Sequence, residues 1–438
     1  MTVAFKTFGC RLNQAETAQY AAAFAAAGIA NVPFGAPADI VVVHTCTVTR
    51  TAEDTCLKQL RHLRRNAPEA LLVVSGCAVE TVPARALDAL TVDLVVPREH
   101  KDELVARVLR RLGVGSPLPP VPCRPIAHRA TLKIQDGCDF ACAYCIIPHT
   151  RGKPQSRPFD ACVREARDRI AAGFAEIVVT GCNIACYEDA GRRLPDLLAA
   201  LANLPGLGRL RIGSLEPGTV EREVIALMAE CAVICRFLHL PVQSGDNTVL
   251  ARMRRRYTIE EVAATVSDAV GRMPDLGLGA DLIAGFPGET PEEFARTKHW
   301  VSRLPFSNLH VFPFSERPGT PAAAFGGTVP QAERKRRVRE LNRIRTRMRG
   351  AFAGQFIGRT VRVLIERVDA AGRGSGWTGE YLGCRVEGLT ASAEGRLVSC
   401  VPYAREADLL LARNPEGNVR AGRTDEDRPL AQTPDAPR

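Results

Sequence analysis

The sequence lacks any apolar run of roughly 18 residues or more, the length that a membrane-spanning helix requires. The first residues, MTVAFKTFGC, also lack the basic start and the apolar stretch of a secretory signal. No internal tandem repeat is present apart from an alternation of strand and helix patterns. We therefore expect a cytoplasmic protein that has no membrane partner.

Cysteine, by contrast, is plentiful, with 15 cysteines in 438 residues. In a reducing compartment, such cysteines are better explained as metal ligands and small buried side chains than as disulfides. The length predicts two or three domains, each with its own core. The net charge of +10 is compatible with an anionic macromolecule as partner, and equally with a solvated, Arg-rich surface.

Three cysteines form a C-x3-C-x2-C run, which we call the central triplet: Cys138, Cys142 and Cys145. Iron–sulfur clusters normally take four cysteines, and no fourth follows closely here. The spacing therefore suggests a cluster with one open iron, which the amino and carboxylate groups of S-adenosylmethionine could bind. Three buried cysteines or a zinc site are the alternatives, but zinc would need a fourth Cys or His at a matching distance.

Short apolar runs alternate with amphipathic helix patterns over residues 1–115, which predicts a doubly wound parallel α/β domain. The predicted strands span residues 3–7, 40–44, 71–75 and 92–96, and the predicted helices span residues 14–27, 52–65, 83–90 and 102–112. Three cysteines follow the first three strands, and we call them the N-terminal triplet: Cys10, Cys46 and Cys77. Because ligands gather at the carboxyl ends of such strands, we expect a second cluster site here rather than packing cysteines.

A Pro-rich segment, residues 115–122, is expected to link this domain to the next. Six further strand patterns predict an open partial barrel over residues 124–354, since a closed βα barrel needs eight strands. Strand patterns at residues 360–368, 377–386 and 396–403 predict a small antiparallel β-barrel over residues 355–410. Residues 414–438 have no apolar periodicity and are expected to be disordered.

Many of these segments resemble motifs of the radical-SAM methylthiotransferase family. The N-terminal triplet stands in TFGCRLN, HTCTVT and SGC, and the central triplet stands between KIQDGC and CIIPHTRG. The likeness continues through EIVVTG, RIGSLEP, HLPVQSG, RRRYT, DLIAGFPGET and HVFPFSERPGT, up to about residue 410. It implies a methylthiotransferase N-terminal domain, a partial (βα)6 barrel of radical-SAM type and a C-terminal barrel like a TRAM domain, a nucleic-acid-binding module. Four residues depart from the family pattern: His44, Cys182, Cys186 and Gly213.

Within the family, the residues of the motifs KIQDGC, HTCTVT and RRRYT most resemble those of the branch that acts on threonylcarbamoyladenosine in tRNA. That resemblance implies 2-methylthiolation of the adenine at position 37, next to the anticodon. The same chemistry on isopentenyladenosine-37 of tRNA, or on an aspartate of a ribosomal protein, stays open. An iron–sulfur electron carrier or scaffold that binds RNA is an alternative of another class, although both triplets lack the fourth cysteine that such a carrier would have.

The resemblance also implies two [4Fe–4S] clusters and S-adenosylmethionine as cofactors. The hypothesis gives the central triplet the cluster that reduces S-adenosylmethionine to a 5′-deoxyadenosyl radical, and the N-terminal triplet the cluster that carries sulfur. Such chemistry must come from cofactors, because the adenine C2–H bond is strong and unactivated. An electron donor such as flavodoxin or ferredoxin is expected as a partner.

Six residues are candidates for contacts with S-adenosylmethionine: Tyr144, Thr180, Gly181, Glu216, Gln243 and Asp281. Gly181 would allow close backbone approach, and Glu216 could accept hydrogen bonds from ribose hydroxyls. The alternative is that these residues cap helices or pack in the core. No role is assigned to His149 or His239.

For RNA, residues 333–350 form a helix candidate with nine basic residues against two acidic ones. This helix could follow phosphates, and Trp377 and Tyr381 of the C-terminal barrel could stack on bases. A base to be modified at C2 must also leave its stack. The alternatives are a solvated connecting helix and a barrel that only braces the other domains.

Overall fold

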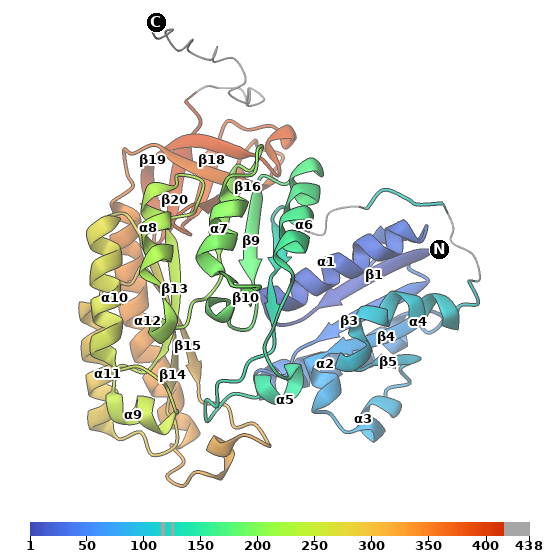
Figure 1. Cartoon of the computed structure of the whole chain (residues 1–438), viewed down its shortest axis with the longest axis horizontal. Helices are drawn as coiled ribbons and strands as arrows, with labels where there is room; N and C mark the ends of the chain where they lie inside the picture. Colours follow the sequence, from blue (N-terminus) through green and yellow to red (C-terminus); the bar gives the residue numbers. More distant parts are fainter. Residues whose placement is uncertain (115–118, 124–126, 416–438) are drawn as a thin grey trace, which may run out of the picture.

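The computed structural model describes residues 1–114, 119–123 and 127–415. In Figure 1 the chain forms three bodies: an N-terminal α/β domain, a central curved sheet with helices around it, and a small C-terminal barrel. None of the helices in the described ranges combines the length and the apolar character of a membrane span. The predicted tail, residues 414–438, lies outside the described residues from position 416 onward.

The N-terminal domain is a five-stranded, all-parallel sheet in the order β2-β1-β3-β4-β5. Its strands are β1 (Thr2–Thr7), β2 (Ala30–Val32), β3 (Ile40–Thr45), β4 (Leu71–Gly76) and β5 (Leu94–Val96). Its helices are α1 (Arg11–Ala26), α2 (Arg50–Asn66), α3 (Ala84–Asp88), α4 (Leu104–Arg111) and the 3-10 turns η1 (Cys77–Glu80) and η2 (Arg98–Glu103). All six residues of β3 are buried, as expected for a central parallel strand covered on both faces.

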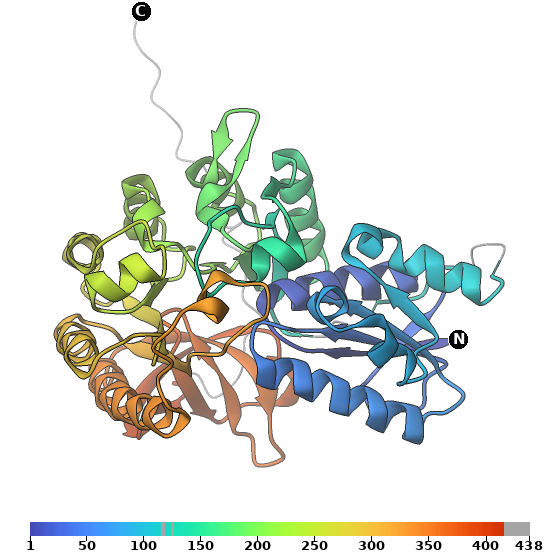
Figure 2. The same cartoon turned by 90° about the horizontal axis from the view of Figure 1, so that it is seen from below.

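The central domain places six parallel strands in two groups, β6-β9-β12 and β13-β14-β15. Isolated parallel bridges, Leu210 to Ile234 and Ser214 to His239, connect the two groups. The strands are β6 (Ala130–Lys133), β9 (Glu176–Thr180), β12 (Arg209–Ile212), β13 (Phe237–Gln243), β14 (Gly277–Ala284) and β15 (Asn308–Pro313). This is the open partial barrel that the sequence predicts, and Figure 2 shows its helices around the outside.

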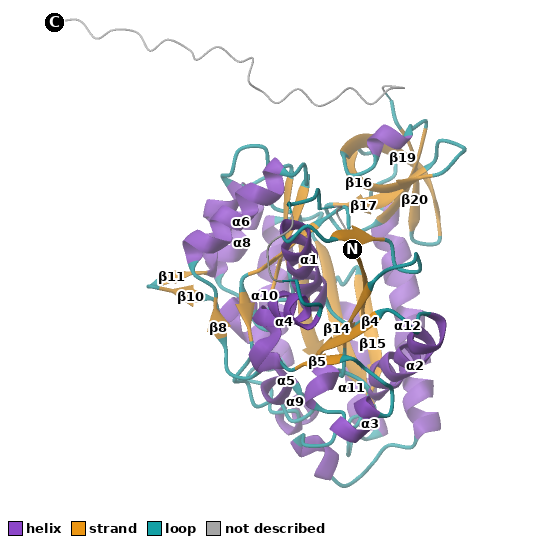
Figure 3. Cartoon of the chain, turned by 90° about the vertical axis from the view of Figure 1, so that its right-hand side faces the viewer, coloured by secondary structure: helices purple, strands orange, loops and turns teal. Residues whose placement is uncertain are grey.

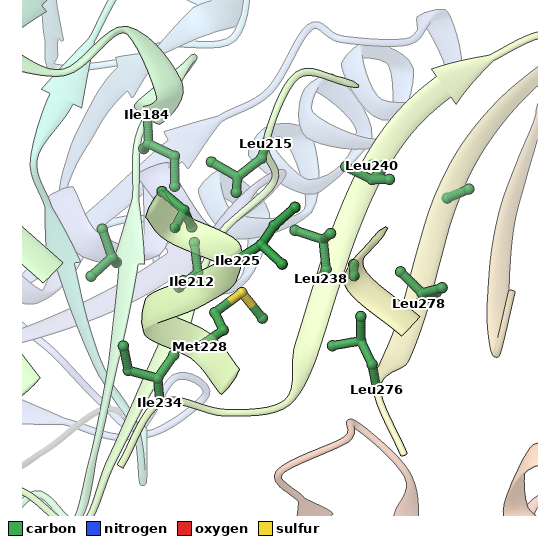
Figure 4. Close-up of a cluster of buried hydrophobic side chains, with 14 of the residues drawn as sticks. Ile184, Ile212, Leu215, Ile225, Met228, Ile234, Leu238, Leu240, Leu276 and Leu278 are labelled. Carbon is green, nitrogen blue, oxygen red and sulfur yellow. The ribbon is translucent and has the colours of Figure 1, made fainter. Parts of the chain in front are cut away.

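These helices are α5 (Ile147–Arg151), α6 (Phe159–Ala171), α7 (Leu194–Ala202), α8 (Arg222–Glu230), α9 (Asn247–Arg252), α10 (Ile259–Arg272), α11 (Pro291–Arg303) and α12 (Gln331–Gly354). Shorter elements are β7 (Gln135–Asp136), β8 (Gln155–Ser156), β10 (Glu188–Asp189), β11 (Arg192–Arg193), η3 (Ile184–Cys186), η4 (Pro217–Thr219) and η5 (Pro321–Ala324). The main core lies between the sheet and this helical layer. Figure 4 shows part of it, where Ile225 and Met228 of α8 pack toward Leu238 and Leu240 of β13.

The C-terminal domain is a closed barrel in the order β16-β17-β18-β20-β19. Its elements are β16 (Val361–Val368), β17 (Gly374–Thr378), β18 (Gly383–Glu387), β19 (Leu397–Glu406), β20 (Leu409–Arg413) and the turn η6 (Ala391–Ala393). The single strand predicted over residues 377–386 is wrong, because a turn at Tyr381 separates β17 from β18. Strand β20 was not predicted, and it runs past residue 410. Both misses involve turns with a left-handed residue that is not a usual turn former, Tyr381 (φ 68°) and Ala407 (φ 54°).

Two buried arginines of β12 join the barrel to the central sheet. The fully buried Arg211 donates to Glu176 Oε1 (2.8 Å) and to the carbonyls of Thr378 and Gly379 (3.0 Å each). Arg209 donates from Nε to Glu176 Oε2 (2.7 Å). Burial alone would raise the pKa of Glu176, but the two guanidiniums outweigh it and hold that pKa below its usual value. The barrel thus lies at the amino ends of the strands, opposite the edge where ligands gather (Figure 1).

Tyr381 is a contact point of all three domains. Its ring lies 4.9 Å from both Trp377 and Phe237, and its hydroxyl accepts from Arg11 Nη2 of α1 (2.9 Å). Trp377 in turn donates to Glu366 (3.1 Å). Tyr381 therefore acts as an interdomain brace, and the expectation of a free stacking platform for RNA is wrong at this position.

We predict that Glu176→Gln destabilises the protein by about 3–5 kcal/mol, because it leaves two buried guanidiniums without a counter-charge. Thermal and urea unfolding measure the change. Glu165→Gln is the matched control, since Glu165 pairs with Arg157 and Arg169 at a half-buried site, where a loss within about 1 kcal/mol is expected. Equal destabilisation by the two variants would contradict the role given to Glu176.

Candidate functional site

The central triplet lies in the loop between β7 and α5, beyond the carboxyl end of β6. Gly137 starts this loop with φ 68°, and a Cβ there would collide with the carbonyl of Lys153, so the position requires glycine. The loop is fixed by backbone hydrogen bonds from Cys138 to Gly152 (3.0 Å) and from Ala143 to Met253 (2.9 Å). The three thiols are consequently held on a short, well-anchored loop.

One arginine connects this loop to the strand ends. Arg255 donates to Cys142 Sγ (3.2 Å), to the Tyr144 hydroxyl (3.1 Å) and to Glu216 Oε2 (2.6 Å). Burial, together with the neighbouring thiol of Cys142, raises the pKa of Cys145 to about 12. Metal binding at this loop must therefore release a proton from a thiol that otherwise holds it firmly.

The N-terminal triplet lies at the carboxyl edge of the N-terminal sheet. Cys10 follows β1, Cys46 follows β3, and Cys77 follows β4 at the start of η1. A Cβ on Gly9 would lie 2.8 Å from Cys46 Sγ, which shows how closely the first two loops approach. Burial raises the pKa of Cys77 to about 11, with Cys10 and Cys46 adding to the rise. The convergence expected from the sequence is thus present in space.

A buried ion network, which we call the interdomain network, lies between the two triplets: Glu16 and Lys101 from the N-terminal domain, with Lys133, Asp136 and Arg151 from the central domain. Glu16 accepts from Lys133 Nζ (2.8 Å), from Lys101 Nζ (3.1 Å) and from Arg151 Nη2 (3.2 Å). Arg151 also donates to Asp136 Oδ1 (3.0 Å). Figure 3 shows α1, which carries Glu16, lying alongside the central strands.

Both carboxylates of the network stay ionised. Burial alone would raise the pKa of Glu16, but the hydrogen bond with His44 and the charges of Arg151 and Lys133 hold it well below its usual value. Asp136 follows the same pattern, with Arg151, Lys133 and Lys101 outweighing burial and lowering its pKa. A paired charge cluster of this kind strongly resists the loss of one partner, so it fixes the two domains relative to each other.

The predicted contacts with S-adenosylmethionine lie in three places: around Arg255, at the end of β9, and in a cluster around Asp281. Tyr144 and Glu216 meet at Arg255, beside the central triplet. Thr180 ends β9 and Gly181 follows it, where a Cβ on Gly181 would lie 2.8 Å from Ile184 and 2.9 Å from the Gln135 carbonyl.

Gln243 ends β13, where the chain adopts φ 66°. Arg255 donates to the carbonyl of Pro241 (3.2 Å), two residues before it. This contact brings the end of β13 toward the same arginine.

Asp281 belongs to a separate cluster on three adjacent strands. Its Oδ1 lies 3.0 Å from His239 Nε2 and 3.2 Å from His310 Nδ1. Among the described residues, these three form the only group of three or more metal-ligand side chains whose ligand atoms all lie within 4.8 Å of one another. Burial alone would raise the pKa of Asp281, but the hydrogen bonds with the two histidines hold it well below its usual value. His239, which was assigned no role from its sequence context, therefore has a carboxylate partner.

Three arginines are site residues that sequence reasoning missed: Arg151, Arg255 and Arg317. Each stands in a motif that was recognised, HTRG, RRRYT or SERPGT, but its partners lie far away in the chain. Arg317, for example, donates to Glu53 (2.6 Å) and Thr47 (2.5 Å), next to Cys46. Within the described part of the chain, its Nε and Nη1 are buried without a hydrogen-bond partner. Motif membership was the available signal, but pairing over such distances is not readable from one sequence.

Comparison with known proteins agrees with this architecture. Residues 132–301 match the family model of the radical SAM superfamily, and residues 2–97 match the one described as "Uncharacterized protein family UPF0004". The chain is 34% identical to the threonylcarbamoyladenosine tRNA methylthiotransferase of Bacillus subtilis, over 83% of this chain and 85% of that protein. The chain belongs to the radical-SAM methylthiotransferase family.

Other relatives of this methylthiotransferase carry two different substrate names. The threonylcarbamoyladenosine tRNA methylthiotransferase of Thermotoga maritima is 32% identical, over 91% of this chain and 96% of that protein. The tRNA-2-methylthio-N(6)-dimethylallyladenosine synthase of Erythrobacter litoralis is 35% identical, over 84% of this chain and 86% of that protein.

Among solved structures, the radical S-adenosylmethionine methyltransferase TsrM of Kitasatospora setae has a TM-score of 0.56 at 15% identity, over 85% of this chain and 80% of that one. This likeness concerns the fold. The predicted family, fold class, transferase activity and cofactors, [4Fe–4S] clusters and S-adenosylmethionine, are confirmed. The alternative of a non-enzymatic electron carrier or scaffold does not fit this family.

We predict that Cys138→Ala and Cys77→Ala each remove about four of roughly eight irons per chain, because each breaks one of two independent thiolate sites. Iron analysis of anaerobically reconstituted protein measures the loss. Cys231→Ala is the control and is expected to keep all the iron, since Cys231 lies at the end of α8, away from both triplets. Loss of all iron from either triplet variant, or no loss, would contradict two separate sites.

Proposed function

We propose that this enzyme converts N6-threonylcarbamoyladenosine at position 37 of tRNA to its 2-methylthio derivative. The observation that carries the proposal is the pair of cysteine triplets on two sheet edges, held together by the interdomain network. The names of the relatives in Bacillus subtilis and Thermotoga maritima support the choice of substrate. Transfer RNA as substrate favours the cytoplasmic location expected from the sequence.

We assign one [4Fe–4S] cluster to the central triplet and one to the N-terminal triplet. Each site supplies three thiols on closely packed loops, in which glycines at positions 9 and 137 make contacts that a Cβ would prevent. In a mononuclear zinc site each sulfur lies about 2.3 Å from the metal, so the ligand sulfurs lie close to one another. In neither triplet do the three sulfur atoms all lie within 4.8 Å of one another. The residues present therefore fit clusters better than a single zinc ion.

When bound, the clusters and S-adenosylmethionine supply the radical and the sulfur, which side-chain acids and bases cannot provide. The residues of this chain orient those groups. We propose Tyr144, Thr180, Gly181, Glu216 and Gln243 as contacts of S-adenosylmethionine near the central triplet. Asp281, the sixth candidate, is paired with two histidines and would contact S-adenosylmethionine from the wall of the barrel.

Arg255 is the residue that positions this group of side chains. It is the common partner of Glu216, Tyr144 and Cys142, and a guanidinium at that place can also pair with the carboxylate of a bound amino acid. The electron for the reaction is proposed to come from a small carrier such as flavodoxin or ferredoxin.

A stripe of four exposed cations on α12 supports tRNA as the partner: Lys335, Arg339, Arg343 and Arg347. They recur every four residues, so successive charges rise by about 6 Å along the helix. None of the four makes an ion pair with any residue in the described ranges, whereas Arg336, Arg337 and Arg349 all do. Free cations in a row can follow the phosphates of an RNA strand.

Methylthiolation of isopentenyladenosine-37 is the second candidate function. The 35% identity to the Erythrobacter litoralis enzyme favours it as much as overall similarity can. The two candidates differ in the substituent on N6 and share every residue assigned above.

Mass spectrometry of digested tRNA separates these candidates. We predict that cells without this gene lose 2-methylthio-threonylcarbamoyladenosine and keep its unmethylthiolated precursor, and that the wild-type gene restores the product while Cys77→Ala does not. Loss of the isopentenyl product instead would transfer the proposal to the second candidate. Unchanged tRNA nucleosides would remove tRNA as the substrate.

We predict that the double variant Arg339→Gln, Arg343→Gln weakens tRNA binding. The slope of log K against log salt concentration is negative, and its magnitude should fall by about 1–2, because two phosphate contacts are lost. Filter binding at several KCl concentrations measures both quantities. Arg336→Gln is the matched control, since Arg336 is already paired with Glu333 and Glu340 on the same helix. An unchanged salt slope in the double variant would exclude the stripe from the RNA interface.

A further inference from the structure

Three adjacent strands carry a group of metal-ligand side chains outside the two triplets, which we call the histidine cluster: His239 of β13, Asp281 of β14 and His310 of β15. The strand register places His310 beside Asp281 and His239 beside Gly279. The alternate residues of β14 pack in the core behind the sheet: Leu278, Ala280, Leu282 and Ala284. Because side chains alternate across a strand, the histidine cluster points toward the inside of the partial barrel.

Both histidines of the cluster meet the same oxygen of Asp281. His239 Nε2 lies 3.0 Å and His310 Nδ1 lies 3.2 Å from Oδ1, and all three ligand atoms lie within 4.8 Å of one another. In a tetrahedral zinc site with bonds of about 2.0–2.1 Å to nitrogen and oxygen, neighbouring ligand atoms lie about 3.3 Å apart. The two separations are close to that value, so an ion can be bound here with small movements of the side chains.

Gly279 sets the position of the first ligand. A Cβ at this residue would lie 2.5 Å from His239 Nδ1. The imidazole therefore lies directly against the backbone of β14, with Nε2 facing Asp281 two residues further along the strand. A larger residue at position 279 would push the ring away from the cluster.

Asn308 contacts the third ligand from the side opposite Asp281. Its side chain is 7% exposed, and its Nδ2 lies 3.1 Å from His310 Nε2. Its Oδ1 is buried without a hydrogen-bond partner in the described part of the chain. A histidine that binds metal through Nδ1 carries its proton on Nε2 and usually donates it to a fixed acceptor. Rotation of the Asn308 amide would present Oδ1 to that proton, so Asn308 is suited to orient His310 on a metal.

The charge of the cluster also favours a cation. Within the described ranges, the two histidines are the only ion-pair partners of Asp281, whereas Glu16 and Glu176 are each paired with arginine. A neutral imidazole offers a hydrogen bond but no counter-charge, and a divalent ion would supply one. The His310 side chain is 45% exposed, which gives an ion a route to the cluster.

We propose that the histidine cluster binds one divalent cation of the zinc class through His239 Nε2, Asp281 Oδ1 and His310 Nδ1. Two imidazoles with one carboxylate suit zinc and similar transition metals, whereas magnesium and calcium prefer oxygen ligands. Three protein ligands leave the fourth tetrahedral position open to water or to a bound group. The site goes beyond the proposed function, and it leaves Oδ2 of Asp281 for the contact with S-adenosylmethionine proposed above.

The test is a zinc titration of the full-length protein, reconstituted anaerobically so that clusters occupy both triplets and then freed of loosely bound metal on a chelating resin. Equilibrium dialysis followed by elemental analysis is expected to give one zinc per chain beside about eight irons. Asn308→Ala should weaken zinc binding about tenfold, because it removes only the outer hydrogen bond. Asp281→Asn and His310→Gln each change a ligand and should weaken it by more than that.

His100→Gln is the matched control. His100 lies 3.6 Å from the carboxylates of Glu99 and Glu103, but these three do not bring their ligand atoms together as the histidine cluster does. This variant should therefore bind zinc like the wild type. If Asp281→Asn and His310→Gln both match the control, the proposal fails.

X-ray absorption at the zinc edge is the second readout. We expect nitrogen and oxygen ligands at about 2.0–2.1 Å, with the scattering pattern of imidazole. Sulfur at about 2.3 Å would place the zinc in a cysteine triplet and overturn the proposal. Neither readout depends on which nucleoside the enzyme modifies, so failure here leaves the proposed function standing.

Discussion

The interdomain network of Glu16, Lys101, Lys133, Asp136 and Arg151 is the interaction on which the arrangement of the site depends. These charges come from two domains, and Glu16 and Asp136 are each buried among three cations. Buried charges of this kind are costly to separate, since each carboxylate left alone would lose its counter-charges in a poorly solvated site. The network therefore sets the orientation of one cysteine triplet toward the other.

Local backbone geometry then places the thiols. Gly9 and Gly76 precede two cysteines of the N-terminal triplet and Gly137 precedes the first of the central triplet, all with positive φ. At Gly9 and Gly137 a Cβ would strike Cys46 or the Lys153 carbonyl, so the close approach of the loops requires glycine. At the other end of the central sheet, Arg211 and Tyr381 attach the barrel without occupying the edge that carries the chemistry.

Much of this fold follows from the sequence. The first four residues of the buried strand β3 are visible as a continuous apolar run, and cysteines after neighbouring parallel strands are expected to converge at one edge. What the sequence could not show is pairing over long separations: Glu16 and Arg151 are 135 residues apart, and neither position has a local pattern that predicts a partner. The turns at Tyr381 and Ala407 were missed because a left-handed Tyr or Ala carries none of the usual Gly or Asn signal.

Relatives named for two different substituents on N6 of adenine align over most of the chain, so overall similarity does not select between them. The framework itself can be tested directly. Pulsed electron paramagnetic resonance on protein with both centres reduced measures the magnetic coupling between them. We expect one narrow distribution of distances between the two centres in the wild type and a broadened distribution in Glu16→Gln. No coupling in the wild type, or an identical distribution in Glu16→Gln, would contradict it.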